Sequence, residues 1–132
     1  MGHHVRPFQP DDAASVDDLW RSAFEGFEDD FPESAGVISL GAARVASMGW
    51  RVLVASDRSG ASCLGAVRCW DDEGVAWLDM LTSARPFAGR DLVHEVQRWA
   101  QERGFRLLRL EIPAGLGLAA YFQWLGFVEV GG

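Results

Sequence analysis

Three short apolar segments separated by four-residue turns constrain the fold of this chain more than any other feature. They read WRVLVAS (residues 50–56), ASCLGAVRCW (61–70) and VAWLDML (75–81), and they are joined by DRSG and DDEG. Runs of this length that are rich in β-branched and aromatic residues and bounded by Gly, Asp and Ser are typical of strands. Connections this short join antiparallel neighbours, because a parallel crossover needs a dozen residues or more. The pattern therefore predicts an antiparallel meander.

The segments before the meander predict one strand and two helices. HVRPF reads as a short strand, and apolar residues then recur at helical spacing in a helix that begins near Asp11 or Asp12. Gly26 and Pro32 end this helix. A weaker helical segment, AGVISLGAARVASMG, follows.

Helices alternate with strands after the meander. An amphipathic helix is expected from about Gly89 to Arg103, followed by a strand at FRLLRLEI, a helix at PAGLGLAAYFQWL and a last strand at GFVEV. Strands that first run consecutively and then alternate with helices indicate an α+β fold. We expect a single domain over residues 1–132, built on a mixed, mostly antiparallel sheet of about six strands flanked by helices.

Composition narrows the class of protein. The chain has 132 residues and a net charge of −7, which argues against nucleic-acid binding because that depends on basic surface. No apolar run approaches the roughly 20 residues that span a bilayer, so we expect no membrane partner. The N-terminal MGHHVRPF lacks the apolar core of a signal peptide, and a cytoplasmic location is therefore expected.

The metal-binding and disulfide-forming residue types are few and scattered. Cys63 and Cys69 are six residues apart, about 20 Å along one strand, which is too far for a disulfide. Both are expected to be buried free thiols. His3 and His4 are expected in a mobile terminus, and His94 stands alone on a helix. We therefore predict no metal site.

The stretch ARPFAGRDL, residues 84–92, joins the third strand of the meander to the amphipathic helix. The first turn of a helix has unpaired N–H groups and a partial positive charge, and a glycine lets a phosphate approach them. Gly89 supplies one glycine, between Arg85 and Arg90. The stretch is either a phosphate-binding loop or an ordinary strand-to-helix turn, and the residues leave both interpretations open.

Three motifs make the chain resemble the GNAT (Gcn5-related N-acetyltransferase) superfamily, as a divergent member. VRPFQPDDAASVDDLW looks like the opening strand and helix of that family. AGRDLVHEVQRWAQERGF looks like the helix that carries the acyl-CoA pyrophosphate, and YFQWLGF looks like the closing helix, turn and strand. The resemblance covers nearly the whole chain and implies acetyl-CoA, or another acyl-CoA, as cosubstrate with no metal.

The resemblance also implies which residues hold the acyl-CoA. Backbone N–H groups near Leu81 and Thr82 would hold the pantetheine and polarise the thioester carbonyl, and the pyrophosphate would lie at the helix N-terminus. The residues implied there are Arg85, Ala88, Gly89 and Arg90. The family loop reads Arg/Gln-x-x-Gly-x-Gly/Ala, so this chain departs from it with Ala84 at the first position and Phe87 at the first glycine.

The catalytic candidates are two acids and a tyrosine. Asp79 lies within the apolar VAWLDML strand, where burial raises the pKa of a carboxylate, and Glu111 ends the FRLLRLEI strand. Either one is a candidate general base, although Asp79 also fits a solvent-facing acid. The family often has a tyrosine on its last helix that protonates the departing thiolate. Here that position holds Phe122 and Tyr121 comes one residue earlier, so a structural role for Tyr121 stays open.

Strand alternation assigns the residues of the third meander strand to two faces. Val75, Trp77, Asp79 and Leu81 are expected on one face. Ala76, Leu78 and Met80 are expected on the other.

The acidic loop FEGFEDDFPES falls where the family has the loop over its acceptor site. Glu25, Glu28 and Asp29 are candidates for attracting a protonated amine, although such a run of charge also fits a solvated loop. The resulting hypothesis is acetyl transfer to an amine of a small molecule or peptide. The alternative is a catalytically degenerate domain that binds CoA or another protein.

The family has a seventh strand, which the sequence lacks. Without it, the FRLLRLEI strand is left with an open hydrogen-bonding edge. We expect either direct pairing with GFVEV or a homodimer with a shared sheet.

Overall fold

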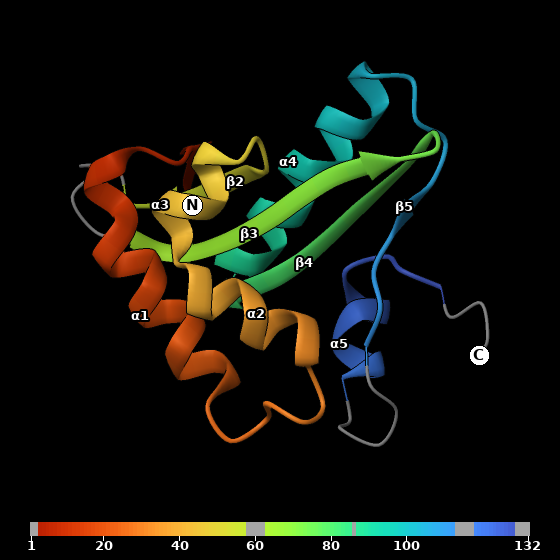
Figure 1. Cartoon of the computed structure of the whole chain (residues 1–132). Helices are drawn as coiled ribbons and strands as arrows, with labels where there is room; N and C mark the ends of the chain where they lie inside the picture. Colours follow the sequence, from red (N-terminus) through yellow and green to blue (C-terminus); the bar gives the residue numbers. More distant parts are fainter. Residues whose placement is uncertain (1–2, 58–62, 86, 113–117, 129–132) are drawn as a thin grey trace.

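The computed structural model describes residues 3–57, 63–85, 87–112 and 118–128 (Figure 1). In chain order its elements are β1 (His4–Pro7), the short 3₁₀ helix η1 (Pro10–Asp12), α1 (Ala13–Phe24), α2 (Pro32–Leu40), α3 (Ala42–Ser47), β2 (Arg51–Ser56), β3 (Cys63–Asp72), β4 (Val75–Ser83), α4 (Ala88–Glu102), β5 (Leu108–Arg109) and α5 (Ala119–Trp124). No helix in the described ranges is long and apolar enough to cross a membrane.

The sheet has the order β1-β2-β3-β4-β5. Strands β1 to β4 pair antiparallel with their neighbours, and β5 pairs parallel with β4. The predicted meander is confirmed as β2, β3 and β4, and the α+β class with a mixed, mostly antiparallel sheet is confirmed as well.

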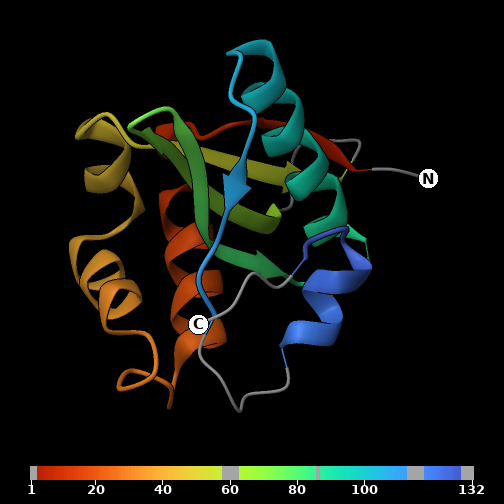
Figure 2. The same cartoon turned by 90° about the vertical axis from the view of Figure 1, so that its right-hand side faces the viewer.

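Helices cover both faces of the sheet (Figure 2). The helices α1, α2 and α3 pack on one face around the fully buried Trp20 and Val16. Helix α4 packs on the other face through Leu92 and Val96, which belong to the predicted apolar stripe and are fully buried. Each face therefore has its own apolar core, with the sheet between them.

Strand β4 contains a β-bulge that changes which residues share a face. Ala66 pairs with Thr82 and Arg68 pairs with Asp79, so two residues of β4, Met80 and Leu81, lie opposite one residue of β3. Met80 has a left-handed backbone, with φ of +56°. Its side chain belongs to the core under α1–α3, whereas Leu78 belongs to the core under α4. The expectation that Met80 shares a face with Leu78 is therefore wrong, because the bulge interrupts the two-residue alternation.

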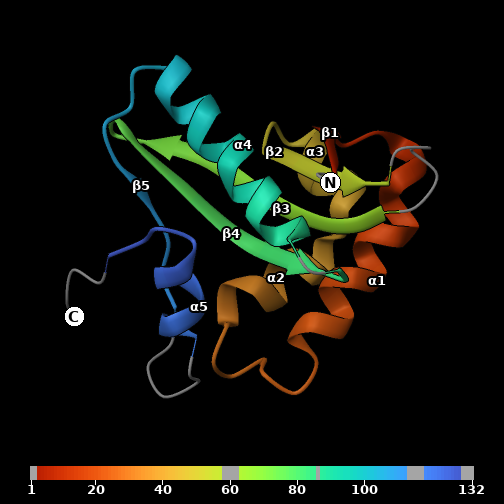
Figure 3. The same cartoon turned by 180° about the vertical axis from the view of Figure 1, so that it is seen from behind.

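Strands β4 and β5 stay together for only two residue pairs. Ala76 pairs with Leu108 and Trp77 with Arg109, and the two strands then diverge (Figure 3). Residues 78–83 of β4 have no strand partner on that side within the described ranges. The predicted separation between these strands is present, and FRLLRLEI is a much shorter strand than expected.

Three further elements differ from the sequence-based expectation. The weak helical segment is two helices, because Gly41 between them has a φ of +88° that a helix does not accept. Helix α5 begins only at Ala119, and the PAGLG segment before Leu118 lies outside the described residues. Gly126, Phe127 and Val128 are not in a strand, and the last two residues of GFVEV lie outside the described residues.

The two cysteines are free thiols on β3, as predicted. Cys69 is fully buried, and burial raises the pKa of its thiol to about 12. Cys63 is half-buried, which also raises its pKa. A thiolate is therefore scarce at both positions at neutral pH.

Candidate functional site

A pocket of about 480 Å³ lies where the end of β4, the first turn of α4 and α5 meet. It brings together three of the predicted site residues, Leu81, Arg85 and Tyr121. The other lining residues are Ser83, Ala84, Phe87 and Trp124. The pocket thus adjoins the part of β4 that leaves β5.

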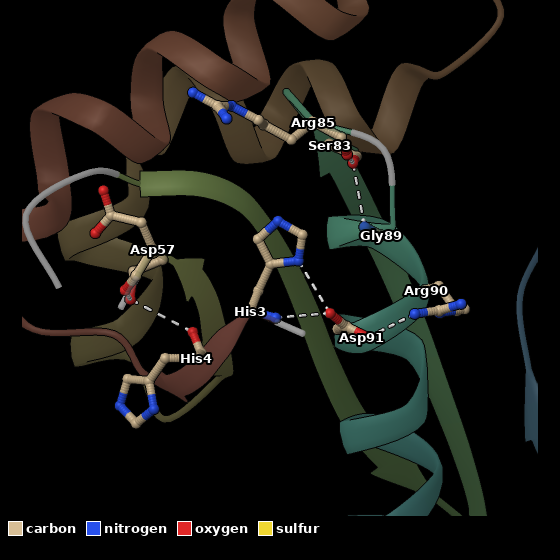
Figure 4. A network of polar contacts seen from close by, with 9 residues as sticks. His3, His4, Asp57, Ser83, Arg85, Gly89, Arg90 and Asp91 are labelled. Atoms are coloured by element: carbon tan, nitrogen blue, oxygen red, sulfur yellow. Dashed lines mark hydrogen bonds and ion pairs between the residues drawn. The ribbon is translucent and has the colours of Figure 1, made fainter. Parts of the chain in front are cut away.

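The N–H groups in the first turn of α4 are partly occupied by the chain itself. The Gly89 N–H donates to the Ser83 hydroxyl at 3.1 Å, and that hydroxyl donates to the Arg85 carbonyl at 2.6 Å (Figure 4). The Ala88 N–H donates to the same carbonyl at 3.2 Å. Of the three amides predicted to hold a pyrophosphate, two therefore already have partners, and only that of Arg90 has none within the described residues.

Gly89 is also the place where α5 touches α4. A Cβ atom at this position would overlap the Tyr121 hydroxyl oxygen, so any other residue requires the Tyr121 side chain to move. The glycine therefore serves the approach of a tyrosine ring in addition to any approach of a ligand. Burial raises the pKa of Tyr121, so its hydroxyl keeps its proton at neutral pH.

The two arginines of the loop differ in what they contact. The Arg90 guanidinium lies over the Phe87 ring at 4.5 Å and is 3.6 Å from the Asp91 carboxylate. Arg85 is exposed, lines the pocket and forms no ion pair with any described residue. Figure 4 shows its side chain extending away from the first turn of α4. Arg85 is therefore the more available cation for an anionic ligand.

Leu81 and Thr82 follow the bulge directly. Leu81 lines the pocket, and the Thr82 side chain is buried with its hydroxyl 3.3 Å from the Ala66 carbonyl. The side chain of Thr82 is thus committed to the sheet. Of Thr82, only the backbone remains to contact a ligand, as the family resemblance implies.

Asp79 is paired with an arginine that the sequence analysis did not identify. Arg68, its partner in the β3–β4 register, donates from Nε and Nη2 to the two carboxylate oxygens at 2.7 and 2.5 Å. The buried Arg68 guanidinium contacts the rings of both Trp50 and Trp70, at 4.5 and 4.8 Å, and these two rings contact each other edge to face. Trp77 stacks on Trp70. These contacts fix the Asp79 carboxylate in one orientation.

The acid–base properties of Asp79 reflect two opposing effects. Burial raises the pKa of Asp79, while the hydrogen bonds and charge of Arg68 act to lower it. The carboxylate of Glu33, on α2, adds to the increase in the pKa of Asp79. Glu111 is exposed and does not line the pocket at the end of β4. The structure therefore separates the two predicted bases into a half-buried acid paired with Arg68 and a solvated one.

Two of the three acids predicted to attract an amine share a second hollow. A pocket of about 600 Å³ lies between α1 and α2, and Glu25 and Glu28 line it together with the edge-to-face pair Phe24 and Phe31. One Glu28 oxygen accepts a hydrogen bond from the Gly26 N–H at 3.2 Å. Asp29 does not line this pocket.

The N-terminal histidines are placed, which corrects the expectation of a mobile terminus. The His3 backbone N–H and Nδ1 both lie 2.9 Å from an Asp91 carboxylate oxygen in α4, and His4 begins β1 (Figure 4). Burial alone would raise the pKa of Asp91, but the contacts with His3 hold it below its usual value. Within the described residues no group of three or more His, Cys, Asp or Glu side chains is arranged to hold a metal ion.

The sequence analysis missed three residues of the site. Ser83 is one of many serines, and nothing in its spacing marks it as the partner of Gly89. Arg68 is paired with Asp79 only through the register of two strands. Trp124 lies in the quoted YFQWLGF motif, but its exposure depends on how α5 packs. Strand alternation in a hairpin was the only signal available for Arg68.

No protein-family model matches the chain, and neither does any curated protein. Solved structures match along almost the whole chain. A ribosomal-protein-alanine N-acetyltransferase from Brucella melitensis matches with a TM-score of 0.73 at 20% identity, covering 97% of this chain and 86% of that one. A GNAT family acetyltransferase of the same organism, in complex with acetyl-CoA, matches with a TM-score of 0.69 at 21% identity, covering 96% and 82%.

A third solved structure is similar over the whole length of this chain. AAC(6')-Iy in complex with the bisubstrate analogue CoA-S-monomethyl-acetylneamine matches with a TM-score of 0.71 at 16% identity, covering 100% of this chain and 95% of that one. These likenesses establish that the chain has the fold of the GNAT acetyltransferases.

Proposed function

Because this chain has the GNAT fold, we propose that it is an acyl-CoA-dependent N-acetyltransferase acting on an amine of a small molecule or peptide. The observation that carries the proposal is the separation of β4 from β5 beside the pocket lined by Leu81, Arg85 and Tyr121. This place offers unpaired strand backbone, a cation and a protonated hydroxyl together. Those are the groups that a thioester with a phosphate chain requires.

Acetyl-CoA, when bound, supplies the acetyl thioester. The β4 backbone near Leu81 and Thr82 would hold it, and Arg85 and the first turn of α4 would contact its phosphates. The residues fit this ligand in part: Arg85 is available, whereas the N–H groups of Ala88 and Gly89 already have partners in the chain. We infer that the Ser83 hydroxyl gives up the Gly89 N–H when a phosphate binds.

Two side chains move the protons in the proposed reaction. Asp79, or Glu111 through water, accepts a proton from the amine, whose nitrogen then forms the bond to the acetyl carbon as the carbon–sulfur bond breaks. Tyr121 donates its proton to the departing thiolate. The high pKa of Tyr121 keeps that proton available, and the acids at Glu25 and Glu28 favour a cationic acceptor.

The degenerate, non-catalytic alternative also has a specific observation in its favour. Both oxygens of Asp79 are engaged by Arg68, and two amides in the first turn of α4 are occupied. A domain of this kind would bind CoA without turnover.

Release of the CoA thiol from acetyl-CoA, measured with a panel of amines, separates the two functions. We expect turnover with at least one amine, and at least a tenfold loss in Asp79→Asn. Asp72→Asn, which changes an exposed acid at the end of β3, is the matched control and should behave like the wild type. Calorimetric binding of acetyl-CoA without turnover on any amine would favour the alternative. If neither binding nor turnover occurs, acetyl transfer and CoA binding are both excluded, and only a protein-binding domain is left of the alternative.

Arg85→Ala tests the assignment of the cation. A charge-assisted hydrogen bond contributes roughly 1.5–3 kcal/mol, so we expect acetyl-CoA affinity to fall about tenfold or more. Arg103→Ala removes an exposed arginine at the far end of α4 and should leave the affinity unchanged. Equal affinities in the two variants would place the phosphate contacts elsewhere.

A further inference from the structure

Two aromatic side chains with no role in the proposed reaction line the pocket at the end of β4. Phe87 is 49% exposed and Trp124 is 58% exposed. Their ring centroids are 6.1 Å apart, and Tyr121 stacks on Trp124 at 6.2 Å. We call the part of the pocket that Phe87 and Trp124 line the aromatic recess. Large exposed apolar groups gathered beside a cavity mark a binding surface, because leaving them in water is unfavourable.

Phe87 holds its ring in the recess at an energetic cost. Its backbone is left-handed, with φ of +72°, at the residue that precedes α4. This conformation is unfavourable for a non-glycine residue, and glycine adopts it freely. Strained backbone of this kind is concentrated at ligand-binding sites. The strained backbone of Phe87 therefore suggests that its ring contributes to binding the ligand of this pocket.

The charges around the recess limit which ligands fit. The Arg90 guanidinium packs on the Phe87 ring at 4.5 Å, and Arg85 lines the same pocket without an ion pair to any described residue. One part of the pocket is thus aromatic and an adjoining part is cationic. A simple acyl chain would use only the first part, and a cationic ligand would be repelled by the second. A planar heteroaromatic ring joined to phosphates uses both.

We propose that the aromatic recess binds the nucleotide end of acyl-CoA, with the base stacked on Phe87 and Trp124 and Arg85 paired with a phosphate. This inference rests on the proposed function and assigns to it two residues for nucleotide recognition. It also gives a reason for the departure of this chain from the glycine-rich loop: the ring of Phe87 supplies stacking at the position where a glycine would supply only space.

Calorimetric titration with adenosine 3′,5′-bisphosphate tests the recess without requiring turnover. We expect the wild type to bind this nucleotide. Trp124→Ala should weaken binding about tenfold, because stacking of a base on an aromatic ring is lost, and Trp124→Phe should retain most of it. Met48→Ala, which removes an equally exposed apolar side chain from the end of α3, is the matched control and should not change binding.

Phe87→Gly shows whether the Phe87 ring stacks on the nucleotide base or obstructs the binding of acetyl-CoA. This variant relieves the left-handed strain and restores the glycine of the family loop, so its thermal stability should not fall. On the present proposal it weakens acetyl-CoA binding about tenfold and leaves S-acetylpantetheine, which has no nucleotide, unaffected. Tighter acetyl-CoA binding in Phe87→Gly would show that the ring obstructs the site, and would overturn the proposal.

Two other results would also overturn the inference. One is unchanged nucleotide binding in Trp124→Ala. The other is a dimer that Trp124→Ala dissociates in sedimentation, together with no nucleotide binding by the wild type, because a second copy would then be the occupant. Failure of the proposed function has a different signature: the nucleotide binds through the recess, but no amine is acetylated.

Discussion

At the scale of single residues, Gly89 combines a packing contact with a position in the proposed ligand site. Its lack of a side chain admits the Tyr121 hydroxyl, and its N–H is bonded to Ser83. Any phosphate at the first turn of α4 must therefore arrive next to a tyrosine and a serine hydroxyl. The hydroxyl groups of Ser83 and Tyr121 are therefore as close to a ligand in this pocket as the backbone amides are.

Tyr121→Phe tests the proposed proton donor. We expect kcat to fall by about 100-fold, which is typical for loss of a general acid, with acetyl-CoA affinity changed less than about threefold. Because burial raises the pKa of Tyr121, the alkaline decline in wild-type kcat caused by its ionisation should lie above about pH 10. The measurements are steady-state kinetics across pH and calorimetry. A variant with normal kcat would return Tyr121 to a packing role.

At the scale of elements, a buried ion pair joins β1 to the start of α1. Arg6 donates to both oxygens of Asp12 at 2.6 and 2.8 Å, and the Gln9 N–H donates to Asp12 at 2.8 Å. The carboxylate is thus turned toward the strand, and no side-chain cap bond to α1 is formed. This pair therefore connects β1 directly to the residue before α1.

Asp12→Asn should destabilise the fold by roughly 2 kcal/mol, because charge-assisted hydrogen bonds are lost and Arg6 is left unpaired. The hydrogen bond from Arg6 lowers the pKa of Asp12 below its ordinary value. The folded-state pKa is therefore the lower one, so this stability is present above about pH 4 and is lost as pH falls further. Urea unfolding at several pH values measures it. The difference between variant and wild type should shrink toward pH 3, and Asp11→Asn, an exposed neighbour, should show no such effect.

Ser83→Ala addresses the first turn of α4. Loss of the hydroxyl that accepts from Gly89 should cost about 1 kcal/mol, as for other helix-capping side chains. Acetyl-CoA affinity should be equal or higher, because the Gly89 N–H is then available to a phosphate. Ser47→Ala, which removes an exposed serine from α3, is the control. Weaker acetyl-CoA binding in Ser83→Ala would mean that the hydroxyl itself contacts the ligand.

At the scale of the whole molecule, the shortest strand of the described sheet, β5, lies at one of its edges. Within the part of the chain that the structure describes, β5 has two residues, lies at the edge of the sheet and pairs only with the first part of β4. The neighbouring Leu107 is 51% exposed. An edge of this kind is a surface on which a strand from a second chain can pair.

We predict that the protein is a homodimer at micromolar concentration, with the β5 edge at the interface. Sedimentation velocity measures this directly. Leu107→Glu should weaken the dimer, because a charge would be placed at the apolar edge, whereas Leu40→Glu on α2 should not. A monomer of 14.5 kDa across the concentration range would contradict the prediction and leave direct pairing of GFVEV with β5 as the expected arrangement.

The sequence by itself determined the order and type of most elements. Alternating apolar runs between four-residue turns specify the meander, and the stripe through Leu92 and Val96 specifies α4, because both patterns are local consequences of periodicity. The position of the loop between β4 and α4 could also be predicted, since Gly89 and the end of the strand are local signals. Local patterns therefore sufficed for the α+β class and for the region of the site.

Only the tertiary structure decided which side chains meet at the site. The bulge at Met80 reverses strand alternation, and no composition or spacing signal marks it. The Arg68–Asp79 pair follows from the register between two strands, and the contact between Tyr121 and Gly89 follows from the position of α5 beside α4. Such contacts join residues distant in sequence, so they depend on packing and strand register, which no local pattern encodes.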